Sequence, residues 1–423
     1  MSSFDGLNIT SGYHLAWAFF LSIIAKISSL ISDSKYFFLF NAFFVSSLLI
    51  AITAHRNFKD PVHKICFFLI IFSTFSLTEV ALLTMLCLLV LSHALSNKSL
   101  DNKLILFCMF LIPLVRIDAA FFCCSVALLS FYFQSPKTAL KITLAFTLGL
   151  ATQFALMQLI FDSFFSVSSI IKASSSSIQN FQSNIVYNLG NSKAMILRSS
   201  SYLILNLILI SVLLKNGLNR FEAFVIILLP NSLFLHHFLI SGMRSWYWAT
   251  PLALSFFSAV WLSKEGYLNR YVVNIFSILF ILPALTGFVY SAVKYAPDQQ
   301  YSKQFVMDLN HYASKHGFII YQIDGSGFTG FFSEQPLING DGLTNSYDYL
   351  NKKNDHDLKY FLRNNKICLI ITNMRQTGQY VVNYYGLEVL PQDTEIVISP
   401  PDNLNSNYSN FALHKLNNLN CAN

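Results

Sequence analysis

The sequence predicts a polytopic α-helical membrane protein with a small extracytoplasmic α/β domain at its C-terminal end. Two observations indicate this fold class. Of the 423 residues, 54% are hydrophobic and 12% are charged, whereas soluble domains contain about 25% charged residues. The composition also changes near residue 294: apolar segments precede this point, and an ordinary soluble pattern follows it. We therefore expect a multi-helix transmembrane domain over 1–294 and a soluble α/β domain over 295–423.

Nine apolar segments make up the first domain, and a spanning helix needs about 20 residues. The segments are 13–31, 36–54, 65–95, 104–133, 142–162, 196–214, 222–240, 246–263 and 271–291. Segments 65–95 and 104–133 are longer than one span needs, and each has charged residues near its middle. Because a charge in the middle of a bilayer is unfavourable, we expect each to form two short helices that meet at a polar break.

Positive charge predicts how these segments cross the bilayer. Lys and Arg are enriched in cytoplasmic loops, so we expect the short basic loops to lie inside: 55–64, 97–103, 135–141, 215–220 and 264–270. The polar breaks, the Ser-rich stretch 163–193 and the C-terminal domain then share the external face. Segment 13–31 begins and returns outside in this arrangement, which suggests an interfacial or re-entrant helix. The alternative is a plain spanning helix with an internal N-terminus.

The net charge of +7 does not indicate a nucleic-acid partner, because many of the basic residues lie in these short loops rather than on one soluble face. The seven cysteines show no CxxC or Cys/His spacing typical of a metal site. Five of them lie in or beside apolar stretches, where a free cysteine is a small packing residue.

The C-terminal domain shows alternating helix and strand patterns. Phe305, Leu309 and Tyr312 recur at three- and four-residue spacing, which predicts a helix over 301–316. Strands alternating with helices favour a small three-layer α/β unit. The other expected elements are strands at 318–321, 367–371, 395–399 and 411–416, helices at 345–352 and 356–364, and turns at Asp324-Gly325 and at Asn339-Gly340-Asp341-Gly342.

The external polar breaks hold the first candidate site. Glu79 lies in one break, Arg116 and Asp118 lie in the other, and Arg244 precedes the run Trp246-Tyr247-Trp248. Carboxylates in such a place can act as a general base or hold a divalent cation, and arginines can bind phosphate through paired hydrogen bonds. The alternative is a structural Arg–Asp pair with an aromatic belt at the membrane interface.

A second candidate is the run Tyr13-His14 at the start of an apolar helix. His14 could carry a proton, because its side chain titrates near neutral pH. A histidine beside aromatic residues at an interface can also be a simple anchor.

Four stretches resemble conserved runs of the GT-C group of bacterial integral-membrane glycosyltransferases, in particular its arabinofuranosyltransferase-like branch. FDGLNITSGYHLAW at 4–17 resembles the family run FDGxNPTNGYHPLW, and LTEVAL at 77–82 is similar to GLETAL. Arg116-Ile117-Asp118 matches the family's RxD, and INGDGLTN at 338–345 resembles VNLDGLVN. The resemblance is therefore spread over most of the chain.

The resemblance implies an inverting transfer of a sugar from a polyprenyl-phosphate donor to a glycan or lipid acceptor outside the bacterial cytoplasmic membrane. With this resemblance, Glu79 and Asp118 are the candidate catalytic carboxylates, and Arg116, His14 and Tyr13 are candidate substrate-binding residues. Arg244 lies outside the four runs and is a candidate phosphate contact by its position. A divalent cation, Mg²⁺ or Mn²⁺, could assist at the donor phosphate.

The chain departs from the family pattern at its start. Family members carry a spanning helix and an acidic motif, which holds the principal catalytic acid, before the FDG run, whereas this sequence begins only three residues ahead of it. We expect a longer chain with an additional helix upstream; the alternative is an inactive relative. A function of another class also stays open, namely a transporter or an assembly scaffold whose external domain binds a partner.

Overall fold

The chain forms two compact units in the computed structural model. One, here called the helical unit, comprises His14–Leu156 and Lys172–Gly287, and the other, the sheet unit, comprises Met1–Tyr13, Met157–Ile171 and Phe288–Asn423. The structure describes residues 15–72, 79–97, 100–161, 163–165, 193–216, 218–236, 248–294, 296–316, 319–323, 327–340, 349, 351, 357–365, 367–373, 382–384, 387–389, 394–400 and 411–417.

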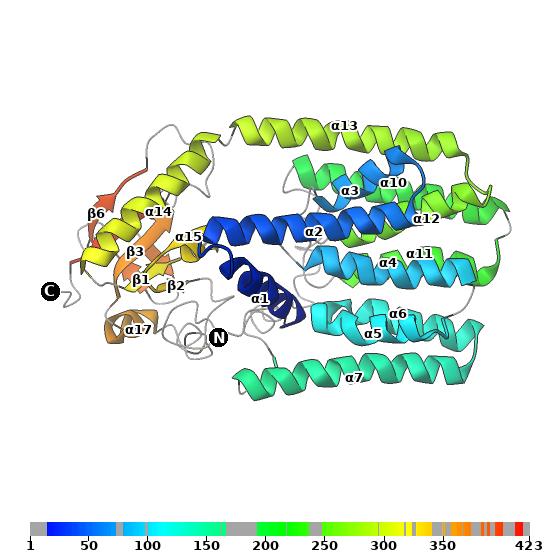
Figure 1. Cartoon of the computed structure of the whole chain (residues 1–423), viewed down its shortest axis with the longest axis horizontal. Helices are drawn as coiled ribbons and strands as arrows, with labels where there is room; N and C mark the ends of the chain where they lie inside the picture. The colour runs from blue at the N-terminus through cyan, green and yellow to red at the C-terminus, as the bar shows by residue number, and fades with distance from the viewer. Residues whose placement is uncertain are drawn as a thin grey trace. The chain divides into compact units, whose positions relative to one another are not determined.

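The first part of the chain is helical, as expected. Figure 1 shows most of its helices running side by side. They are α1 (Leu15–Ser29), α2 (Lys35–Asn57), α3 (Pro61–Phe72), α4 (Val80–Asn97), α5 (Lys103–Val115), the short 3-10 helix η1 (Ile117–Ala119), α6 (Ala120–Phe133), α7 (Pro136–Phe161), α10 (Lys193–Asn216), α11 (Arg220–His236), α12 (Ala249–Lys264) and α13 (Arg270–Lys294).

Both long apolar segments are divided as predicted. Segment 65–95 forms α3 and α4, and segment 104–133 forms α5 and α6, with η1 between them. Segment 13–31 forms the single helix α1, which at 15 residues is shorter than the roughly 20 residues of a spanning helix. The choice between a re-entrant and a spanning segment at this position therefore stays open.

Two of the described helices pass a length and hydropathy test for a membrane span: α2 and residues Pro136–Ile160 of α7. The other apolar helical stretches found over the described residues are 10–17 residues long, among them Ser200–Lys215 within α10 and Arg270–Thr286 within α13. The architecture is thus mostly helical with a mixed sheet near its C-terminal end, and the polytopic membrane fold stays a prediction.

Helix α12 is the centre of the helical unit. Thirteen of its 16 residues are buried, and it contacts α3, α4, α10 and α11. Its alternation of small and large side chains, such as Ala253, Phe256 and Ser258, lets neighbouring helices approach from several sides. This packing brings the start of α4 beside the start of α12.

Helix α7 approaches α5 closely at Gly149. A Cβ atom there would lie 2.3 Å from the Phe110 carbonyl oxygen and 2.8 Å from Pro113 Cγ. We expect Gly149→Val to destabilise the protein by about 1–3 kcal/mol, because α7 must move away from α5. Thermal unfolding in detergent measures this loss. Thr147→Val, on the exposed side of the same helix, is the control and should change stability little; equal losses in both variants would contradict the prediction.

The sheet unit is a small α/β domain. Its described elements are α14 (Ala296–His316), β1 (Ile319–Gln322), α15 (Gly327–Phe332), β2 (Leu337–Asn339), α17 (Leu358–Asn364), β3 (Ile367–Asn373), β4 (Val382–Tyr384), β5 (Leu387–Val389), β6 (Thr394–Ile398) and β7 (Phe411–Leu416). Five strands form one sheet in the order β2-β1-β3-β7-β6. β2, β1 and β3 are parallel, whereas β7 and β6 are antiparallel to their neighbours.

The sheet is covered on both faces, as the alternation of strands and helices predicted. Ile320 and Leu369 pack with Phe305 of α14 on one face, while Tyr321 and Ile370 pack with the α17 side chains on the other. Strand β7 lies where expected, and β1 and β6 are each shifted by one residue. The elements α15, β4 and β5 were not predicted, and the expected helix at 345–352 lies mostly outside the described residues.

Gly340 ends β2 at a close contact between strands. Its N–H donates to the Gln322 carbonyl oxygen at 2.6 Å, and a Cβ atom at this position would lie 2.7 Å from Ile323 Cα. Close approach of the backbone therefore requires glycine here. The Asp341-Gly342 turn that we expected next lies outside the described residues.

His414 predicts a pH dependence of the sheet unit. Its buried ring lies between β7 and β3, with Nε2 3.0 Å from Thr372 Oγ1, and burial lowers its pKa below 6.5. Below about pH 6.5 the unfolded state therefore binds more protons than the folded state. The free energy of unfolding is highest above that pH and falls as the pH decreases. We expect hydrogen exchange of β3 and β7 in the intact chain to report this loss once intrinsic exchange rates are subtracted. His414→Gln, which does not titrate, should respond less; identical pH responses would contradict the prediction.

Candidate functional site

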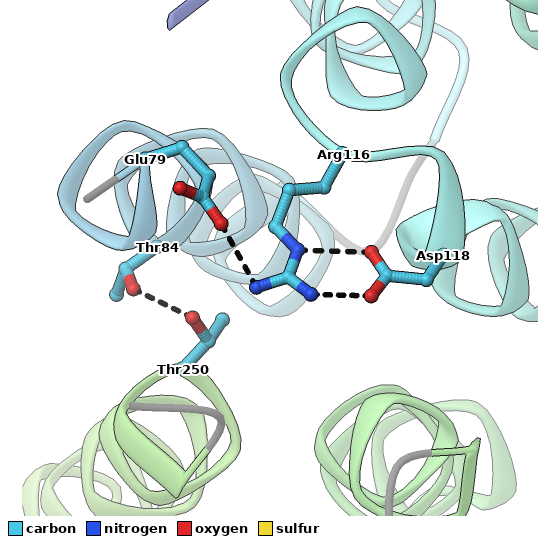
Figure 2. A network of polar contacts seen from close by, with 5 residues as sticks. All are labelled: Glu79, Thr84, Arg116, Asp118 and Thr250. Atoms are coloured by element: carbon cyan, nitrogen blue, oxygen red, sulfur yellow. Dashed lines mark hydrogen bonds and ion pairs between the residues drawn. The ribbon is translucent and has the colours of Figure 1, made fainter. Parts of the chain in front are cut away.

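Arg116 is the centre of a buried ion cluster in the helical unit (Figure 2). Its Nη1 donates to Glu79 Oε1 at 3.0 Å, and its Nε donates to Asp118 Oδ1 at 2.9 Å. A further bond joins Nη2 to Asp118 Oδ2. Arg116 is 2% exposed and Glu79 is 7% exposed, whereas the Asp118 side chain is 21% exposed. Among the described residues, the cluster therefore joins two carboxylates through one guanidinium.

Helix ends position these three side chains. Glu79 directly precedes α4, where a carboxylate interacts favourably with the helix dipole, and its carbonyl oxygen accepts a hydrogen bond from Leu83 N. Arg116 ends α5 with an extended backbone (φ −153°, ψ 119°). The tight turn of η1 then places Asp118 against the guanidinium of the same polar break. The two breaks therefore meet at one end of these helices.

A threonine pair lies beside the cluster and links two helix starts. Thr84 Oγ1 on α4 is 2.9 Å from Thr250 Oγ1 on α12, and both side chains are buried. Trp248 precedes α12 and is 0% exposed, and its Nε1 has no hydrogen-bond partner among the residues that the structure describes. The ring of Trp248 instead packs against Tyr202 and Phe234.

A network of neutral polar groups joins α10, α11 and α12 near the start of α12. Tyr202 donates to Asn231 Oδ1 at 2.9 Å, and Asn231 donates to Asn206 Oδ1 at 3.0 Å. Asn206 in turn lies 3.4 Å from Ser255 Oγ. These groups satisfy one another and fix the contacts among α10, α11 and α12, so we assign them a structural role.

The structure thus brings together three of the six predicted site residues. Glu79, Arg116 and Asp118 are in direct contact, although 37 residues separate Glu79 from Arg116 in the sequence. Tyr13, His14 and Arg244 lie outside the described residues, and their placement stays a prediction.

Sequence reasoning missed the threonine pair as a neighbour of the cluster. Thr84 stands five residues after Glu79 in an otherwise apolar helix, and Thr250 follows the aromatic run. An isolated threonine in such a helix was the available signal, but it did not reveal which helix supplies its partner.

The cluster can accept a proton or orient a hydroxyl group, because it holds two carboxylates in fixed positions. Three of the five Arg116 N–H groups donate to these carboxylates, so the carboxylates already neutralise the guanidinium that a phosphate would have to bind. Among the described residues, no group of three or more His, Cys, Asp or Glu side chains is arranged to hold a metal ion. The divalent cation therefore stays a prediction.

Searches against protein-family models, curated proteins and solved structures find no match to this chain. The GT-C resemblance accordingly rests on the four sequence runs alone.

Proposed function

We propose that this chain is a GT-C-type glycosyltransferase of the bacterial cytoplasmic membrane. It would move a sugar from a polyprenyl-phosphate donor to a cell-envelope or surface-glycan acceptor on the external side. The observation that carries the proposal is the convergence of Glu79, Arg116 and Asp118, from two separate polar breaks, into one buried cluster at the ends of their helices.

The distribution of apolar side chains supports membrane embedding. Only 28% of the apolar window of α2 and 22% of that of α7 are buried, and large side chains such as Phe40 and Leu159 are 63% and 82% exposed. Soluble monomers rarely expose apolar surface of this extent. Polar groups such as Asn206 and Ser255 are buried instead. Lipid around the helices explains this distribution, because it solvates apolar side chains and excludes polar ones.

A disulfide supports an external location for the sheet unit. Cys368 on β3 is disulfide-bonded, and disulfides persist in oxidising compartments outside the cytoplasm. The described cysteines of the helical unit are free. The position of Cys368 agrees with the external C-terminal domain that the basic loops predict.

The proposed reaction assigns one role to each member of the cluster. Glu79 accepts the proton of the acceptor hydroxyl as the hydroxyl oxygen attacks the anomeric carbon of the donor sugar. The bond from that carbon to the donor phosphate breaks. Polyprenyl phosphate leaves with the bonding electron pair. Arg116 and Asp118 hold the Glu79 carboxylate in place, and Arg244 is the proposed contact for the leaving phosphate.

Lipid-linked sugar turnover tests this function. The purified full chain is reconstituted in liposomes with polyprenyl-phosphate hexoses or pentoses and a glycan acceptor, and released polyprenyl phosphate is measured. We expect release that depends on the acceptor. A scaffold or transporter is the rival function. The bonding of Arg116 to two carboxylates favours this rival, because such a cluster can have a purely structural role. Absence of both donor binding and turnover across the donor panel would select that rival.

A further inference from the structure

A second feature of the helical unit lies at the end of α10. A groove of about 800 Å³ runs between α10 and the start of α13, which is within the size range of small-molecule sites. Its walls are mainly apolar, with Leu207, Ile208 and Val272 among them, and its polar members include Ser211, Lys215 and Tyr267.

The groove is apolar along its length and cationic at one end. Lys215 lies in the last turn of α10, and Tyr267 lies in the loop that leads to α13. The Ser211 hydroxyl donates to the Leu207 carbonyl oxygen at 2.8 Å, so it adds little polarity to the wall. A long apolar body with an anionic head would match this arrangement.

The outer surface around the groove is also apolar. Leu207 and Leu214 on α10 are 63% and 84% exposed, and Ile275 and Leu279 on α13 are 57% and 64% exposed. Further basic residues stand at the ends of neighbouring helices: Arg220 begins α11, Lys264 ends α12, and Arg270, which pairs with Asp60, begins α13. The groove therefore combines an apolar flank with the positive charge of Lys215.

We propose that the groove binds an anionic phospholipid of the cytoplasmic leaflet. One acyl chain lies along α10, and the headgroup phosphate contacts the Lys215 ammonium and the Tyr267 hydroxyl. The choice of lipid follows from charge complementarity: juxtamembrane Lys and Arg attract anionic headgroups, and the apolar walls fit a hydrocarbon chain. The proposal rests on the membrane embedding proposed above and is independent of sugar transfer.

Native mass spectrometry of the delipidated full chain tests this site. The protein is exchanged into micelles that contain phosphatidylglycerol, phosphatidylcholine or both, and bound lipid is counted. We expect about a fivefold preference for phosphatidylglycerol, the effect of one Lys near an anionic headgroup. Lys215→Gln should remove this preference, and Leu207→Trp should reduce binding of both lipids by filling the groove. Lys141→Gln, which alters a lysine on α7, should leave the preference unchanged.

Three outcomes would overturn the proposal. Equal binding of the two lipids by the unaltered chain removes the anionic preference. Retention of the preference in Lys215→Gln, together with unchanged lipid binding in Leu207→Trp, places the lipid elsewhere. Competition by soluble glycerol phosphate as strong as that by the lipid assigns the site to a free phosphate. Extraction of the chain from membranes by alkaline carbonate would instead contradict membrane embedding itself, which separates the two failures.

Discussion

Replacing Arg116 by Met is expected to destabilise the helical unit by about 3–5 kcal/mol, the cost of removing the guanidinium that pairs with the buried Glu79 carboxylate. Glu79 and Asp118 both lose their bonds to the guanidinium. Glu79 is nearly inaccessible to water, so hydration offsets little of this loss. Thermal unfolding of the purified chain in detergent measures the effect.

Two matched variants test the cause of this loss. Arg270→Met breaks the pair of Arg270 with Asp60, in which the Arg270 side chain is 69% exposed. This variant should lose about 0–1 kcal/mol of stability. Adding Glu79→Gln and Asp118→Asn to Arg116→Met removes the uncompensated charges and should restore part of the stability. A loss in Arg116→Met no larger than that in Arg270→Met would show that the cluster is not an electrostatically coupled unit.

Glu79→Gln is expected to lower sugar transfer by about 10²–10⁴-fold, the range for loss of a general base. Glutamine keeps a side-chain oxygen that can accept the Arg116 Nη1 hydrogen bond, so the cluster should keep its shape while losing the proton acceptor. Turnover of a lipid-linked donor and thermal unfolding are measured on the same preparation, which separates a chemical defect from a folding defect.

Asp118→Asn is the matched comparison for this prediction. It also removes one carboxylate from Arg116, but Asp118 has only a positioning role in the proposed reaction. We expect a smaller loss of turnover than in Glu79→Gln. Unchanged turnover in Glu79→Gln would remove Glu79 from the reaction, and equal losses in both variants would favour a role of the intact cluster in folding.

The polar breaks show how far the sequence could predict the site. The charges of Glu79 and of Arg116-Ile117-Asp118 interrupt apolar runs, and this local pattern was enough to predict that each run forms two helices. The alternation of the basic loops with these breaks also predicted that both breaks lie on the external side of the membrane. The direct bond between Arg116 and Glu79 was not predicted, because it depends on how α4 and α5 pack.

In the sheet unit, too, local patterns were predicted from the sequence, whereas contacts between distant segments were not. The strands that became β1, β3, β6 and β7 were predicted from apolar runs. Short elements such as α15 and β4 have too few residues to show a period, so they were missed. The order β2-β1-β3-β7-β6 and the change from parallel to antiparallel pairing arise from contacts between distant segments.

Sequence by itself determined which stretches of the first part of the chain are apolar and helical and which ionisable side chains interrupt them, because propensity and hydropathy act over neighbouring residues. Tertiary structure decided that Glu79 shares a guanidinium with Asp118, that Thr84 meets Thr250, and that α10 and α13 leave a groove ending in Lys215. These arrangements depend on packing of side chains far apart in the chain, and spacing along one segment carries no information about them.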